Sequence, residues 1–187
     1  MAVAVIQIGL FSVWSLFLVN FNAEHEAEMR IVGVNLAREG VEVIRNIRDS
    51  NWLKSTYNSI HPDGSAWFWD DGLSNGTYAV NFDSVSPDPN LDHQDIYVSA
   101  NPGMEGFYTN TSDGRKTPYQ RKIILTGICC TDTTPNDLKC DDLNYSSAKC
   151  GEANSLKIGI NVISQVNWTI TGQSRQAILE DDLYDWK

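Results

Sequence analysis

The four cysteines are the residues whose type and spacing point most directly to chemistry. They lie in one short segment, at Cys129, Cys130, Cys140 and Cys150. A structural zinc site needs ligand pairs two to four residues apart, and neither that spacing nor a nearby histidine occurs here. Two disulfides that staple a loop are therefore predicted, which requires an oxidising location outside the cytoplasm. Because adjacent cysteines rarely bond to each other, Cys129 pairs with Cys140 or with Cys150, and Cys130 takes the other.

An acidic segment offers a second set of candidate ligands. Asp88, Asn90 and Asp92 stand at the first, third and fifth positions of an oxygen-ligand calcium loop. The sixth position is His93 instead of glycine, and the twelfth is Ser99 instead of glutamate. The pattern therefore favours a solvated acidic surface over an ordered calcium ion, and we expect the protein to need no cofactor.

Four Asn-x-Ser/Thr sequons are weak candidate glycosylation sites, because a sequon alone does not establish that a sugar is attached. They begin at Asn75, Asn110, Asn144 and Asn167. The sequence contains no nucleophile elbow, phosphate-binding glycine loop or His-Glu-x-x-His motif, so we expect no enzyme activity. The tryptophans are expected to fill a core instead of forming a sugar-binding platform, because they lie in or beside predicted helices and strands.

The N-terminal segment, 1–23, is the element that must place these groups in the cell. It has no charged residue. As a helix, about 21 residues cover roughly 30 Å, the thickness of a bilayer's hydrocarbon layer. The segment lacks the basic start and small-residue cleavage site of a signal peptide. An all-round apolar helix would also need a larger protein to bury it. A membrane anchor is therefore predicted in preference to a cleaved signal peptide or a buried soluble helix.

The next segment, 24–54, is periodic in a different way. Apolar residues form a wide stripe at three- and four-residue spacing: Gly33, Val34, Leu36, Ala37, Gly40, Val41, Val43, Ile44 and Ile47. The other face carries charges of alternating sign, at Arg38, Glu42, Arg45 and Asp49. No proline precedes Pro62, so one continuous helix is predicted to about residue 54, loosened near Gly33 or Gly40.

Residues 55–187 are predicted to form an exported, β-rich head. Strand patterns occur at 64–72, 77–82, 119–127, 157–170 and 174–179, while 83–105 has the composition of a loop. Turns are predicted at Asn75-Gly76 and Thr171-Gly172. The expected fold is α+β, with one antiparallel sheet of roughly four to six strands packed on the amphipathic half of the helix.

A long helix that is apolar and then amphipathic, followed by an antiparallel sheet and a cysteine-stapled loop, resembles a type IV pilin. NLAREGVEVIRNIRDSNWL at 35–53 is similar to the segment after the anchor in prepilin-like proteins related to minor pilins and pseudopilins, as in candidate-phyla bacteria. VNWTITGQSRQAILEDDLYDW at 166–186 is similar to their closing hairpin. Prepilins also share a basic leader, a peptidase-cut junction and a glutamate just after it. This sequence has none of these before Glu24. Either it begins a few residues inside the mature protein, which we expect, or the subunit lacks this glutamate.

The resemblance implies a structural subunit of an extracellular filament on the bacterial cell surface, anchored in the inner membrane before assembly. Its expected partners are further copies of itself, in a helical homopolymer, and the pilus assembly machinery. The alternatives are a minor pilin or pseudopilin of a type II secretion or DNA-uptake machine, and a monomeric membrane-anchored adhesin. A net charge of -10 argues against electrostatic binding of nucleic acid.

The apolar segment supplies the expected assembly core. Its predicted members are Ile6, Leu10, Phe11, Trp14, Leu16, Phe17 and Val19. A basic cluster is expected to border a solvated hairpin, or else to meet the acidic region of a neighbouring subunit. It consists of Arg115, Lys116, Arg121 and Lys122.

Overall fold

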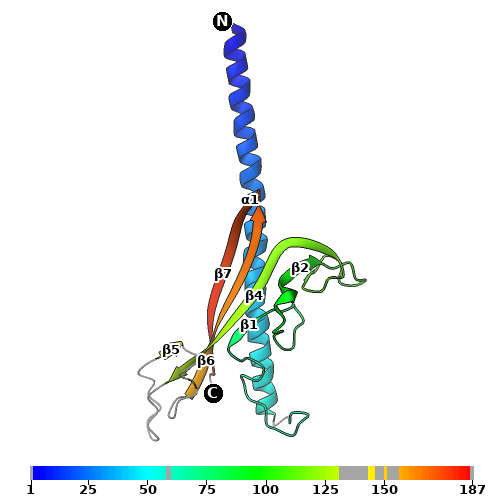
Figure 1. Cartoon of the computed structure of the whole chain (residues 1–187), viewed down its shortest axis with the longest axis vertical. Helices are drawn as coiled ribbons and strands as arrows, with labels where there is room; N and C mark the ends of the chain where they lie inside the picture. Colours follow the sequence, from blue (N-terminus) through cyan, green and yellow to red (C-terminus); the bar gives the residue numbers. More distant parts are fainter. Residues whose placement is uncertain (1, 58–59, 131–142, 146–149, 151–155, 186–187) are drawn as a thin grey trace.

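One unbroken helix runs through the first third of the protein. The computed structural model describes residues 2–57, 60–130, 143–145, 150 and 156–185. Its helix, α1 (Ala2–Thr56), is continuous, which confirms the single helix predicted from the missing proline. The first half of α1 projects from the head, and the second half lies along the sheet (Figure 1). At 1.5 Å per residue α1 is roughly 80 Å long, so one small domain covers only part of it.

The described residues form one antiparallel sheet of seven strands, which confirms the α+β class. The strand order is β3-β2-β4-β6-β7, and β1 and β5 each pair with β4. The strands are β1 (Gly76–Tyr78), β2 (Asp95–Val98), β3 (Tyr108–Thr109), β4 (Arg115–Cys130), β5 (Leu143–Tyr145), β6 (Leu156–Ile170) and β7 (Gln173–Tyr184), and a 3-10 helix, η1 (Leu91–Gln94), precedes β2.

The strand predictions were right for the long strands and wrong for two other segments, and of the strand predicted at 77–82 only the start lies in β1. Residues 64–72 form no strand, because Ala66 makes only an isolated bridge to Ile60. The segment 83–105, expected to be a loop, contains η1 and β2. The predicted C-terminal hairpin is confirmed: β6 and β7 pair from Ile170 opposite Gln173 to Gly159 opposite Tyr184. Both residues of its two-residue turn have positive φ, as a tight hairpin turn of this type requires.

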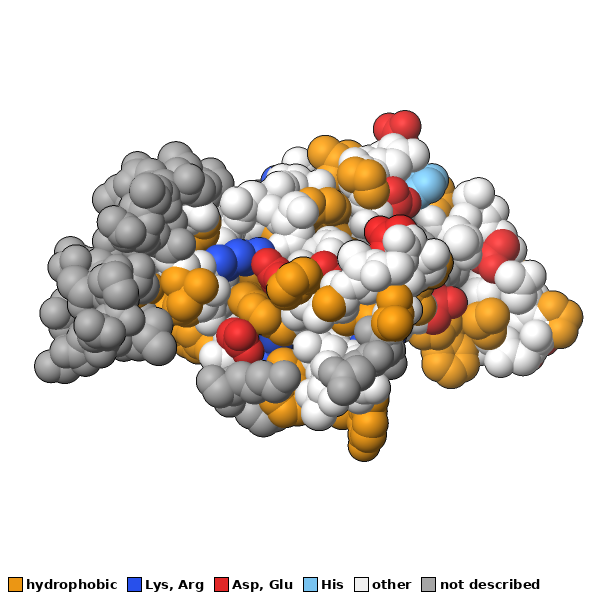
Figure 2. Space-filling model, turned by 90° about the horizontal axis from the view of Figure 1, so that it is seen from below, with side chains coloured by type: hydrophobic (Ala, Val, Ile, Leu, Met, Phe, Trp, Pro, Cys, Tyr) orange, Lys and Arg blue, Asp and Glu red, His pale blue; other side chains and the backbone are white. Residues whose placement is uncertain are grey.

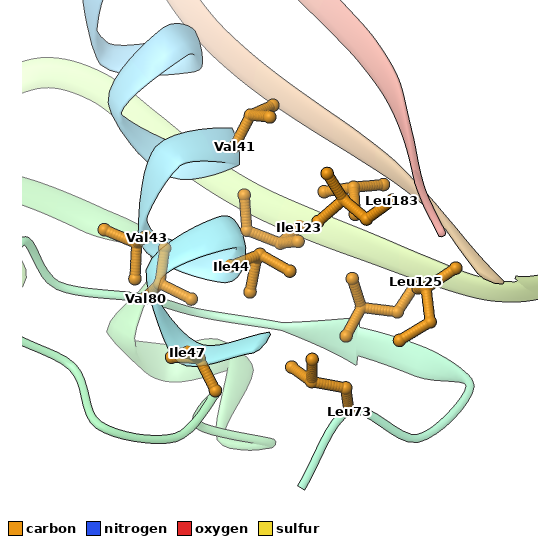
Figure 3. Packing of buried hydrophobic residues seen from close by; sticks show 11 residues of the cluster. Val41, Val43, Ile44, Ile47, Leu73, Val80, Ile123, Leu125 and Leu183 are labelled. Carbon is orange, nitrogen blue, oxygen red and sulfur yellow. The ribbon is translucent and has the colours of Figure 1, made fainter. Parts of the chain in front are cut away.

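The core lies between the second half of α1 and the sheet. One cluster joins Val41, Val43, Ile44 and Ile47 of α1 to Leu73, Val80, Ile123, Leu125, Ile160, Val162 and Leu183 (Figure 3). A second cluster, nearer the N-terminus, consists of Leu36, Ala37, Ile96, Tyr119, Val166 and Trp168. The predicted apolar stripe is therefore the buried face of α1. Val34 is the exception, because its side chain is exposed.

Gly33 and Gly40 allow α1 to approach the sheet closely, and the predicted loosening of the helix at these residues is wrong. A Cβ atom on Gly40 would lie 2.5 Å from Ser164 Oγ and 2.8 Å from Ile123 Cδ1. A Cβ atom on Gly33 would lie 2.7 Å from the ring of Trp168. Both glycines thus serve packing, and α1 stays helical through them.

Candidate membrane and assembly surface

The first half of α1 is covered by nothing in the described part of the chain. Every residue from 6 to 28 is exposed. The seven residues predicted for the assembly core retain between 53 and 76% of their accessible surface. This helix is long and apolar enough to cross a membrane, as the predicted anchor requires. The described part of the chain does not bury it, in contrast to what a buried soluble helix would require.

The helical backbone and the Ser12 hydroxyl of this segment form their hydrogen bonds locally. The backbone amides and carbonyls of α1 pair within the helix, so they need no water. The Ser12 hydroxyl donates to the carbonyl of Ile8 at 2.8 Å. Phe17 lies edge-on to Phe21 with ring centroids 4.4 Å apart, and Trp14 stacks 6.3 Å from Phe17. The segment therefore suits either lipid or the side chains of other apolar helices.

The first hydrogen bonds between the head and α1 lie just after the apolar segment. Arg175 on β7 donates to Glu26 at 2.9 Å, and the Tyr119 hydroxyl donates to the carbonyl of Met29 at 3.0 Å. Burial raises the pKa of Tyr119 to about 12, with smaller contributions from Tyr108 and Glu28. The boundary between the exposed and the packed parts of the helix therefore falls near residue 28.

Arg121 is a buried charge that the sequence-based interpretation missed. Its side chain lies between α1 and the sheet and donates to Glu39 at 2.8 Å, to the Leu36 carbonyl at 3.0 Å and to the Val80 carbonyl at 2.9 Å. The prediction of a solvated basic cluster is wrong for this residue. Alternation along β4 was the available signal, because Tyr119, Arg121 and Ile123 fall on the same face. Lys116 of the same cluster is exposed and pairs with Asp95.

The disulfide lies at the far end of β4. Cys129 bonds to Cys150, with Cα atoms 5.3 Å apart, so the pairing of Cys129 with Cys140 is excluded. Cys130 is also disulfide-bonded, and Cys140 lies outside the described residues.

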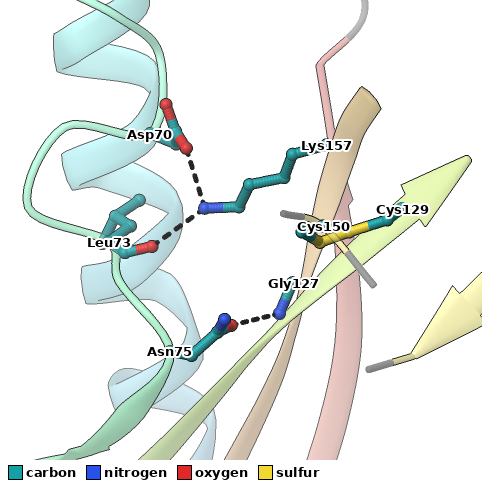
Figure 4. Close-up of a disulfide and its surroundings, with 7 residues drawn as sticks. All are labelled: Asp70, Leu73, Asn75, Gly127, Cys129, Cys150 and Lys157. Carbon is teal, nitrogen blue, oxygen red and sulfur yellow. Dashed lines mark hydrogen bonds and ion pairs between the residues drawn. A yellow bond between two sulfur atoms is a disulfide. The ribbon is translucent and has the colours of Figure 1, made fainter. Parts of the chain in front are cut away.

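Two polar contacts beside this disulfide tie the segment after α1 to the sheet (Figure 4). The side-chain oxygen of Asn75 accepts from the Gly127 amide at 2.5 Å. Lys157 on β6 contacts Asp70 at 2.7 Å and donates to the Leu73 carbonyl at 3.2 Å. The cysteine-stapled end of the sheet therefore also positions the chain that leaves the helix.

Two of the three calcium candidates, Asp88 and Asn90, have side-chain oxygens engaged in local hydrogen bonds. Asp88 accepts from the Asn90 amide at 2.8 Å and contacts His93 Nδ1 at 2.5 Å. Asn90 caps η1 by accepting from the Asp92 amide at 3.0 Å. The bond to His93, more than the bond to Asn90, holds the pKa of Asp88 below its usual value. No group of three or more histidine, cysteine, aspartate or glutamate residues that could hold a metal occurs in the described ranges.

The sequons differ in how free their asparagines are. Asn75 is exposed, but its oxygen serves Gly127. Asn110 is half-buried just after β3, and its backbone N–H donates to the side-chain oxygen of Asn81. Asn167 is half-buried on β6 and accepts from Gln165 at 3.0 Å. Asn144 lies on β5. All four asparagines stay weak candidates for glycosylation.

Comparison with known proteins adds no relative. No family model, no curated protein and no solved structure matches the chain. Function has to be inferred from the geometry of the chain itself.

Proposed function

We propose that this protein is the structural subunit of an extracellular type IV pilus-like filament. The apolar half of α1 anchors the subunit in the inner membrane with the head outside. In the filament the same surface packs against the helices of other copies. The protein acts by assembly, and no catalytic step is assigned to it.

The observation that carries the proposal is an apolar helix that is bare along its length and rigidly continuous with a folded head. Residues 6–28 are exposed, while α1 runs without a break into the core formed by Ile44 and Ile47. A helix with no polar face must be covered on all sides. Lipid covers it before assembly, and in a fibre outside the membrane only other copies can do so.

The head suits the outer surface of such a fibre. The end of the head remote from the N-terminus shows acidic side chains scattered among hydrophobic and neutral ones, and few basic ones (Figure 2), in keeping with a net charge of -10. Charges of this kind are solvated and are screened beyond about 10 Å at moderate salt. Copies that associate by a heterologous, non-closing contact form a helix of subunits and not a closed ring.

The test is a charge placed in the apolar half of α1. Leu10→Asp should abolish fibres that contain this chain, because an unpaired charge in a packed apolar core costs several kcal/mol per subunit, on the order of the cost of burying a charge. Val85→Asp is the matched control, since Val85 is 89% exposed on the head. It should leave fibres unchanged.

The measurements are electron microscopy of cells, immunolabelling of fibres and the amount of chain in the membrane. A Leu10→Asp chain that is stably present in the membrane and still forms normal fibres would contradict the proposal. Wild-type cells that retain the chain in the membrane with no fibre containing it would favour a monomeric anchored protein. Fibres that contain the chain at only a few copies would make it a minor component.

A further inference from the structure

The face of α1 that points away from the sheet carries a continuous exposed stripe. Its members follow one another at three- and four-residue spacing, which keeps them on one side of a helix. They are Phe21, Glu24, Glu28, Ile31, Asn35, Arg38 and Glu42, and all of them are exposed. The residues between them, such as Leu36, Ala37 and Gly40, are buried against the sheet. The stripe therefore faces whatever lies behind the helix.

Three charges on this stripe, those of Glu24, Glu28 and Arg38, have no ion-pair partner within the described part of the chain, and Glu28 and Arg38 have opposite signs. The other charges of this part of α1 are mostly paired: Glu26 with Arg175, Glu39 with Arg121, Glu42 and Asp181 with Arg45, and Arg48 with Asp49. Glu28 and Arg38 form no ion pair there. They lie ten residues apart on the helix, about 15 Å, which is too far for the two to meet within one copy.

An apolar pair on the same stripe has the same spacing. Ile31 is 63% exposed. Its neighbours on the stripe, Glu28 and Asn35, are polar. It follows Phe21, the last large apolar residue of the anchor, by ten residues. If two parallel copies of α1 are displaced by ten residues, Glu28 of one copy is therefore level with Arg38 of the other. The same displacement sets Phe21 level with Ile31.

We propose that this stripe is the contact between neighbouring copies, with parallel α1 helices displaced by ten residues, about 15 Å along the axis. Phe21 of one copy packs on Ile31 of the next, and Glu28 of the first faces Arg38 of the second. The inference rests on the proposed function, because it requires parallel helices in one assembly. The contact is heterologous, so each copy can repeat it.

Other displacements are less complementary. With no displacement, each charge on the stripe faces the same residue of the neighbouring copy, so like charges meet. A displacement of fourteen residues sets Glu24 beside Arg38, but it also sets Glu28 beside Glu42, two like charges. At ten residues Glu24 is level with Trp14, whose indole N–H is a hydrogen-bond donor.

A charge exchange tests the displacement in cells whose wild-type fibres contain this chain. Arg38→Glu sets two carboxylates against each other and should lower the fibre mass per cell about tenfold or more, because like charges across an interface oppose association. Adding Glu28→Arg should restore fibres to near the wild-type amount. Adding Glu24→Arg to Arg38→Glu is the matched control and should not restore them. All three side chains are exposed, so the amount of chain in the membrane should stay constant.

A cross-link measures the displacement directly. Phe21→Cys combined with Ile31→Cys should give a ladder of disulfide-linked copies after mild oxidation of intact fibres, and neither single variant should give a ladder. The proposal is overturned if Arg38→Glu alone assembles like the wild type, if Glu28→Arg fails to restore fibres, if Glu24→Arg restores them, or if the cross-linked ladder is absent. Those outcomes leave a filament subunit with a different register. Wild-type cells without fibres that contain this chain would instead overturn the proposed function.

Discussion

The two halves of α1 have the same backbone structure and opposite environments. From residue 6 to residue 28 every side chain is exposed, whereas a face of the helix from Gly33 to Asn51 is buried against the sheet. The first half is apolar all round as far as Ala23, and the second half is apolar along one stripe only. The distribution of apolar side chains around the helix, and not helix formation itself, decides which half the head stabilises and which half needs lipid or other copies.

The difference also separates two kinds of energy. Contacts of the second half contribute to the folding of a single chain, because α1 and the sheet form one core. Contacts of the first half can contribute only when another molecule is present. A substitution in the second half should therefore change the unfolding of the monomer in detergent, and the same substitution in the first half should not.

The largest expected effect concerns the buried charge under the second half. Arg121→Ala should lower the free energy of unfolding by about 3–5 kcal/mol, because it removes the fully buried partner of the half-buried Glu39 carboxylate. It also removes the donors to the Leu36 and Val80 carbonyls. Urea unfolding of the full chain in detergent micelles, followed by near-UV circular dichroism, measures the loss. Lys116→Ala removes a cation from an exposed pair on the same strand and should change stability little. Equal losses of stability for Arg121→Ala and Lys116→Ala would show that the contacts of Arg121 between helix and sheet do not stabilise the fold.

Much of the fold could be predicted because it follows from local periodicity. An unbroken helical pattern with no proline is enough to predict α1, and the strand patterns at 119–127, 157–170 and 174–179 fall within β4, β6 and β7. The strands β1, β3 and β5 are two or three residues long. Such strands form because β4 or β2 lies beside them, so their own sequence carries little signal.

The errors have the same physical cause. Trp67 alternates with Trp69, which suggested a strand, but its ring is held by the Lys54 ammonium, 4.0 Å from its centroid, and by His61 stacked at 3.5 Å. Those contacts come from the end of α1 and from the following loop. The partner of Cys129 and the burial of Arg121 likewise depend on how distant segments meet. Exposure of the apolar anchor, by contrast, could be predicted from composition alone.

The next largest effect should come from truncating Ile44 in the second half of α1, with Ile6 in the first half as the comparison. Ile44 is fully buried, and Ile44→Ala should lower the free energy of unfolding by about 2–5 kcal/mol through lost burial and a residual cavity. Ile6 is 62% exposed, so Ile6→Ala should leave the unfolding of the monomer unchanged. The same urea titrations measure both. A loss for Ile6→Ala comparable to that for Ile44→Ala would mean that the head contacts the first half of α1 in solution.

Two glycines should respond with opposite signs to one substitution. Gly40→Ala places a methyl group within 3 Å of Ser164 and Ile123. The overpacking cost of about 1–3 kcal/mol should outweigh the gain of about 1 kcal/mol in helix propensity. A Cβ atom on Gly9 meets nothing within 4 Å, so Gly9→Ala should only strengthen the helix. Unfolding of the head measures the first effect, and amide hydrogen exchange around residue 9 in micelles measures the second. A stabilised Gly40→Ala protein would show that α1 and the sheet can separate without cost.

The smallest expected effect tests where the boundary between the two halves lies. Tyr119 holds α1 at Met29, and its pKa is raised from 10.0 to about 12, mainly by burial. Above pH 10 the unfolded phenol releases its proton while the folded one keeps it. The contribution of Tyr119 is therefore complete below pH 10 and is lost as the pH rises to about 12. Tyr119→Phe should lower stability at neutral pH by about 1 kcal/mol, through the lost hydrogen bond.

Tyr119→Phe should also flatten the decline in stability between pH 10 and about 12 that Tyr119 causes in the wild type. Tyr57→Phe is the matched control, because it removes a phenol that is 79% exposed at the other end of the packed half. The control should keep the decline, which urea titrations at several alkaline pH values would measure. If Tyr119→Phe keeps the decline as well, the phenol is solvated in the folded protein. The head would then contact α1 only beyond Met29, at Gly33 and Leu36. The part of the helix that the head does not contact would be longer by about one turn.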